Sequence, residues 1–171
     1  MEVEVTHTVR EIRDKPLLLK VGFAIVLIDV IVLCAGLFTP FWSRTDQIGP
    51  GHEGLWAGCY KSECWNIYDF APLPSWFEAT QAFETLGFIA AIVALVLIVL
   101  YIFVPQTSGK RIVFILGMVA CFAAAGCIIL GIIIYGSKVE TNLSWSFALC
   151  TIAGIIFGVS GILLIVDMLK R

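Results

Sequence analysis

The chain has 171 residues, of which 60% are hydrophobic and only 14% are charged, and its mean hydropathy is +0.97. This composition excludes an ordinary soluble domain and predicts a single integral membrane domain. The formal net charge of −2 leaves no basic surface that would neutralise phosphates, so the sequence gives no sign of nucleic-acid binding.

Residues 1–16 are polar and carry charges of both signs, which predicts a short cytoplasmic tail. The apolar run that follows, residues 17–38, would extend about 33 Å as a helix, which is enough to cross a bilayer. Its long polar lead-in and long apolar core favour a retained signal-anchor over a cleaved signal peptide. We expect residues 17–171 to form one four-span domain that starts with this helix.

Three further apolar runs follow, at about residues 82–104, 112–135 and 145–168. Pro105 ends the first of these runs, because proline cannot continue a helix without losing a backbone hydrogen bond. The connector after Pro105 is short, so the second and third helices should form a tight antiparallel pair.

The lysines and arginines predict the orientation in the membrane. With both termini in the cytoplasm, eight basic residues lie inside and three outside, as the positive-inside rule expects. The eight are Arg10, Arg13, Lys15, Lys20, Lys110, Arg111, Lys170 and Arg171, and the three are Arg44, Lys61 and Lys138. Residues 43–81 then face the exterior, and we expect the protein at the plasma membrane, in a cell junction.

The outer segment 43–81 is too long for a simple connector and should have structure of its own. Residues 55–60 and 64–68 mix apolar, polar and aromatic positions, which predicts two short strands joined by a turn at residues 61–63. Cys59 and Cys64 would then lie in an oxidising compartment, where a disulfide persists. Closing so short a loop stabilises the fold by about 2 kcal/mol.

The outer segment also carries a family resemblance. Trp42, Gly54-Leu55-Trp56, and then Cys59 and Cys64 resemble the W…GLW…C…C signature of the claudin superfamily, which includes peripheral myelin protein, epithelial membrane proteins, the lens fibre membrane protein and channel gamma subunits. The close cysteine spacing resembles the lens and epithelial branch, and Gln81 stands where claudins usually carry arginine. The resemblance implies a left-handed bundle of four transmembrane helices below an extracellular antiparallel sheet of four or five strands. It also implies that Trp42 and Trp56 anchor this sheet to the helices.

Two carboxylates lie within the predicted spans. Asp29 is roughly 20 Å into the first span, where an ionised group is costly, so it should face the bundle interior or be protonated. A hydrogen bond to a neighbouring helix is the favoured role for Asp29, and an ion contact or a partner-helix contact is the alternative. Glu84 lies at the outer end of the second span and is expected to reach the headgroups or the sheet.

The fourth span contains Gly154 and Gly158 in a small-xxx-small pattern, with Gly161 close by. Such faces let helices approach closely, and packing within the monomer is favoured over a dimer. Asn142 begins an Asn-Leu-Ser glycosylation sequon on the outer side, close to the fourth span. Whether this sequon is glycosylated stays open.

No nucleophile–base pair, phosphate-binding glycine loop or cofactor fingerprint is present in the sequence, so we expect no enzymatic activity and no cofactor. His52 lacks a second ligand at metal spacing, so no metal site is expected. The interpretation is a non-enzymatic tetraspan that organises cell–cell or membrane-protein contacts through its disulfide-braced loop. Leu55, Trp65 and Tyr68 are candidate partner contacts, and Trp56 is a further candidate for which the anchoring role is favoured.

Two alternative functions are compatible with the same sequence. One is an auxiliary, gamma-like subunit that modulates an ion channel or receptor. The other is a paracellular barrier or a pore that favours cations, because acidic residues outnumber basic ones in the outer loop. In each case the partners are membrane lipids and other membrane proteins, with no nucleic acid and no small-molecule substrate.

Overall fold

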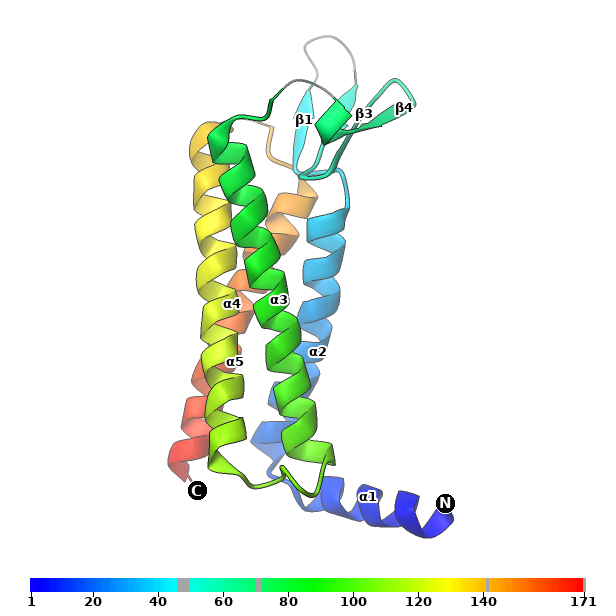
Figure 1. Cartoon of the computed structure of the whole chain (residues 1–171), viewed down its shortest axis with the longest axis vertical. Helices are drawn as coiled ribbons and strands as arrows, with labels where there is room; N and C mark the ends of the chain where they lie inside the picture. The colour runs from blue at the N-terminus through cyan, green and yellow to red at the C-terminus, as the bar shows by residue number, and fades with distance from the viewer. Residues whose placement is uncertain (46–49, 70–71, 141, 171) are drawn as a thin grey trace.

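The four apolar runs form four long helices, which stand side by side as a bundle (Figure 1). The computed structural model describes residues 1–45, 50–69, 72–140 and 142–170. The long helices are α2 (Leu17–Phe38), α3 (Ser75–Phe103), α4 (Arg111–Lys138) and α5 (Trp145–Lys170), and each is long and apolar enough to cross a membrane. The protein is therefore an integral membrane protein with four membrane-spanning helices.

Helices satisfy all their internal backbone hydrogen bonds within one segment, which is why apolar runs of this length adopt them in lipid. Their outward faces carry large apolar side chains that are exposed on the surface of the bundle. Such exposed residues are Ile28, Ile31, Leu86, Ile89, Leu116, Val119, Ile155 and Val159. These residues form the surface that the lipid tails cover, so the helices are apolar on every side.

The helices form a closed ring, in which α3 packs along α4, α4 along α5, α5 along α2, and α2 along α3. Small residues let them approach. A Cβ atom added to Gly36 would lie 2.6 Å from the sulfur of Cys150, and one added to Gly87 would lie 2.6 Å from Cγ1 of Ile128. Both glycines therefore stand where two helices come closest.

The predicted cytoplasmic tail contains a helix, α1 (Glu2–Asp14), which extends sideways from the end of the bundle where both termini are found (Figure 1). It contacts α3. The Nζ atom of Lys20 donates a hydrogen bond to the carbonyl of Arg13 at 2.9 Å, which ties the end of α1 to the first turn of α2.

A small antiparallel sheet caps the opposite end (Figure 1). Its strands are β1 (Ser43–Thr45), β2 (Gly51–Glu53), β3 (Ala57–Tyr60) and β4 (Glu63–Asn66), arranged in chain order. A 3-10 turn, η1 (Ile67–Asp69), follows. The predicted fold class, a membrane helical bundle with a small antiparallel sheet, is confirmed.

Some boundaries differ from the sequence-based expectation. α3 begins at Ser75, well before residue 82, because the helix continues past its apolar run and reaches the sheet. β3 begins at Ala57 because the chain turns at Gly54, whose N–H donates to the carbonyl of Ala57 at 2.9 Å. β4 ends at Asn66, whose N–H is bonded to the carboxylate of Asp69.

Candidate functional site

The sheet is braced at its outer hairpin by a disulfide. Cys59 on β3 and Cys64 on β4 lie opposite each other in the register and are bonded, with 4.1 Å between their Cα atoms. The predicted disulfide is confirmed. Lys61 and Ser62 form the turn between these strands with φ angles of 47° and 74°. Two-residue hairpin turns need such angles, and glycine or asparagine adopts them with less strain than lysine or serine.

Trp42 fixes the base of the sheet to the bundle. Its side chain is fully buried, and its Nε1 atom donates a hydrogen bond to the carbonyl of Gly36 at 2.9 Å. This carbonyl lies in the last turn of α2, where helix carbonyls have no partner within the helix. The indole ring also meets Tyr135 of α4 and Phe147 of α5, with centroid separations of 5.0 and 5.7 Å. One residue thus joins the sheet to three helices.

Backbone hydrogen bonds hold the same region from both sides. The N–H of Trp42 donates to the carbonyl of Glu53 at 2.9 Å, and its carbonyl accepts from the N–H of Ser144 at 2.8 Å. The N–H of Arg44 donates to the carbonyl of Asn142 at 2.9 Å. The connector between α4 and α5 therefore covers the β1 edge of the sheet. At the other edge, no further strand among the described residues pairs with β4.

The Gly-Leu-Trp motif packs onto the end of α2 and the start of α3. A Cβ atom on Gly54 would lie 2.6 Å from Cα of Pro40 and 2.9 Å from the carbonyl oxygen of Thr39, so only glycine fits. The prediction that Leu55 contacts a partner is wrong, because its side chain is fully buried. Its carbonyl accepts a hydrogen bond of 2.6 Å from Nε2 of Gln81, which positions the motif on α3.

The other aromatic residues of the sheet differ in exposure. Trp56 is half-buried against the core of the bundle, and its Nε1 atom has no hydrogen-bond partner within the described residues. Trp65 is half-buried and lies on Gly58, where an added Cβ would be 2.8 Å from its ring. Tyr68 is 60% exposed, and its hydroxyl donates to Oε1 of Gln81 at 3.2 Å. Of the candidate partner contacts, Tyr68 is therefore the most available.

A stack of three aromatic rings lies close to Trp42, and it was not predicted from the sequence. Phe41 stacks on His52 at 4.1 Å and on Trp145 at 5.1 Å between ring centroids. The Nδ1 atom of His52 donates to the carbonyl of Pro40 at 2.8 Å, because a carbonyl can only accept. His52 thus has a structural role in this stack, and no metal-binding cluster occurs among the described residues.

Two carboxylates lie inside the bundle. Asp29 is 1% exposed and Glu84 is fully buried, and none of their oxygens has a hydrogen-bond partner among the described residues. The expected hydrogen bond from Asp29 to a neighbouring helix is therefore not formed there. The expectation that Glu84 reaches the headgroups or the sheet is wrong. Gly131 on α4 leaves room for Glu84, since a Cβ there would lie 2.6 Å from its Oε1 atom.

The glycines of α5 all face α4 of the same chain. Added Cβ atoms on Gly154 and Gly161 would each come within 2.9 Å of an α4 side chain, those of Ile128 and Phe122. One on Gly158 would lie 3.9 Å from Ala125 of the same helix. The three glycines therefore serve the packing of α5 on α4 within one chain. Asn142 is exposed and has a φ angle of 64°, and its glycosylation stays a prediction.

Comparison with models of known protein families gives a match over residues 15–166 to a family described as the PMP-22/EMP/MP20/Claudin family. The matched segment contains the whole sheet and the four long helices apart from the last turn of α5. No individual curated protein matches the chain.

Proposed function

The chain belongs to the PMP-22/EMP/MP20/Claudin family, and we propose that it is a non-enzymatic organiser of contacts between neighbouring membranes or membrane proteins. One observation carries this proposal. The sheet is fixed to three helices at its base, while its β4 edge and the aromatic ring of Tyr68 are left exposed.

Exposed strand edges and aromatic side chains are recurrent features of protein-binding surfaces. On β4, the side chains of Glu63, Cys64 and Asn66 are exposed. The disulfide holds β4 to β3, and the buried Trp42 holds the sheet to the bundle. A surface already fixed in its bound shape loses little conformational entropy on binding, which favours affinity.

The charge distribution supports an outward-facing sheet. Basic residues gather at the end where both termini lie, and the disulfide lies at the opposite end. The positive-inside rule places the basic end in the cytoplasm, and a disulfide suits the oxidising side. We therefore propose that both termini are cytoplasmic and that the protein works at the plasma membrane, in a cell junction.

Site-specific photo-crosslinking in living cells tests the proposal. A benzoylphenylalanine in place of Tyr68 should crosslink to a second membrane protein, or to another copy of this chain. The matched control replaces Phe38, an aromatic residue that is 59% exposed at the end of α2 and should meet lipid. Protein crosslinks from both positions in equal amount, or from neither, would contradict a contact surface on the sheet.

The same experiment separates the two alternatives. An auxiliary subunit would give one stoichiometric channel or receptor at the Tyr68 position. A paracellular pore would give crosslinks to copies of the chain, together with strand-like polymers in transfected cells. The pore has one observation in its favour. Five carboxylates are exposed at the sheet end of the described chain, and their field would attract cations: Glu53, Glu63, Asp69, Glu78 and Glu140.

A further inference from the structure

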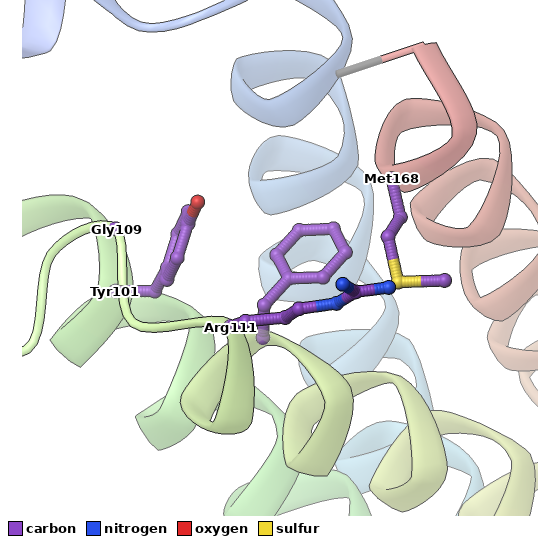
Figure 2. Close-up of a pocket in the computed structure, with 5 residues that line it drawn as sticks. Tyr101, Gly109, Arg111 and Met168 are labelled. Carbon is purple, nitrogen blue, oxygen red and sulfur yellow. The ribbon is translucent and has the colours of Figure 1, made fainter.

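A pocket of about 390 Å³ opens at the end of the bundle opposite the sheet (Figure 2). Tyr101 of α3, Phe114 of α4 and Met168 of α5 form its apolar walls, and Gly109 and Arg111 complete it. Tyr101 and Phe114 are almost fully buried, and their rings are 5.2 Å apart. The pocket thus has a rigid aromatic wall at the depth where helices leave the lipid.

Arg111 supplies the charge of this pocket. Its side chain extends from the start of α4 toward Met168 on α5, with Tyr101 and Gly109 on the other side (Figure 2). Arg111 is exposed, and within the described part of the chain it makes no ion pair or hydrogen bond through its side chain. The guanidinium group is therefore available for a ligand, and its planar shape suits the oxygens of a phosphate.

A second cation lies beside the same wall. The Nζ atom of Lys15 is 5.5 Å from the ring centroid of Tyr101 and donates a hydrogen bond to Oγ of Ser108 in the connector between α3 and α4. Lys20, Lys110 and Lys170 also lie at this end, whereas α1 carries charges of both signs. Among the described residues of the four long helices, Asp167 is the carboxylate at this end, and its side chain is buried. The field at the pocket is therefore positive.

The floor of the pocket is closed. Tyr101 and Phe114 also border a crevice toward Leu19, Gly117 and Leu164, which has no space for even a water molecule. A lipid tail cannot enter there. Outside the pocket, Ile112 and Leu116 of α4 are exposed to lipid and offer a path for acyl chains. A ligand with a polar head in the pocket and its chains along α4 fits both surfaces.

We propose that this pocket binds an anionic phospholipid, with a phosphate of the headgroup on Arg111 and the rest of the headgroup against Phe114 and Met168. A volume of about 390 Å³ is far more than a lone phosphate ion fills. The aromatic wall, the exposed guanidinium group of Arg111 and the position at the membrane face together fit a phosphorylated headgroup. Binding would attach the end of the bundle to the membrane leaflet that is rich in anionic lipid.

The test uses the full-length protein in mild detergent and dioctanoyl phosphatidylinositol 4-phosphate as the probe. We expect saturable binding, at least about tenfold tighter than that of dioctanoyl phosphatidylcholine, which has the same chains and no net charge. Arg111→Gln should weaken binding of the phosphoinositide by about tenfold or more. Lys110→Gln is the matched control, because it removes the same charge from the neighbouring residue, which does not line the pocket.

The outcomes separate the possible sources of binding. Equal weakening by Arg111→Gln and Lys110→Gln would show diffuse attraction to the basic end and would overturn the pocket. Equal affinity for the soluble headgroup, inositol 1,4-bisphosphate, would overturn the assignment to a lipid. Arg111→Lys keeps the charge but loses the paired donors, so binding between that of the wild type and that of Arg111→Gln supports phosphate on the guanidinium. Circular dichroism checks that each variant remains folded.

Discussion

Replacing Trp42 tests how the sheet is held on the bundle. Trp42→Phe keeps an aromatic ring at the fully buried site but removes the Nε1–H that donates to the carbonyl of Gly36. Gly36 is buried, so its carbonyl then lies unpaired away from water. An unsatisfied buried acceptor costs about 1–3 kcal/mol. Trp42→Ala also removes the ring contacts with Tyr135 and Phe147 and should lower the stability of the folded protein by about 3–5 kcal/mol in total.

Hydrogen–deuterium exchange of the purified protein in detergent measures this loss locally. Loss of this hydrogen bond should destabilise the contact between the sheet and the bundle. Amides of residues 51–66 should then exchange about 5- to 150-fold faster in Trp42→Phe, since this range corresponds to 1–3 kcal/mol. Amides in the middle of α3 and α4 should keep their protection, because the bundle core does not depend on Trp42.

Trp145→Phe is the matched control for the same chemical change. Trp145 is 43% exposed and stacks on Phe41, and a phenylalanine ring can keep that stack. We expect its effect to stay within about 0.5 kcal/mol. Unchanged exchange in the sheet of Trp42→Phe, or equal changes in both variants, would refute the role of the Trp42 hydrogen bond as the anchor.

Three further predictions concern the disulfide, the hairpin turn and the buried carboxylate. Joint replacement of Cys59 and Cys64 by serine should lower the stability of the sheet by about 2 kcal/mol and reduce surface delivery without changing topology; free thiols at both positions in the non-reduced native protein would contradict it. Lys61→Asn with Ser62→Gly should stabilise the β3–β4 hairpin by about 1–2 kcal/mol, because both positions have positive φ angles; faster amide exchange in β3 would argue against strain in this turn. Glu84→Met should raise the free energy of unfolding in SDS by about 1–3 kcal/mol, since it removes two buried oxygens that have no hydrogen-bond partner among the described residues. Glu78→Met, on the exposed first turn of the same helix, should change it by no more than about 0.5 kcal/mol. Lower stability of Glu84→Met would mean that the carboxyl group makes a favourable interaction.

Local features of the chain could be predicted from the sequence. Long apolar runs identify the four spans, because each must fill a bilayer with apolar side chains. Cys59 and Cys64 are close in sequence, so their pairing needs only a short hairpin. The helix in the predicted tail and the early start of α3 were missed for a common reason. Polar residues such as Glu78 and Gln81 lower the hydropathy, although the helix continues beyond the lipid.

Features that depend on distant parts of the chain could not be predicted. Glu84 is buried because Gly131, on another helix, leaves the space that its carboxyl group fills. His52 stacks with Phe41 and Trp145 only because the start of α5 lies beside the sheet. Leu55 was expected on the surface because the Gly-Leu-Trp motif does not show which way its side chains point. The hydrogen bond between the Leu55 carbonyl and Gln81 of α3 positions the motif, and it joins residues far apart in the sequence.

Contact between the exposed side of the sheet and another membrane protein can be tested directly. The most direct test of this contact is to isolate the wild-type chain and Tyr68→Ala from cells in mild detergent and to compare the amount of partner protein bound to each. Tyr68 is 60% exposed, so its loss should leave the fold intact. If it is a central contact, bound partner should fall about 30-fold, which corresponds to about 2 kcal/mol. An equal yield of every bound protein with both chains, or a wild-type chain that purifies alone from cells that do not adhere, would contradict the account.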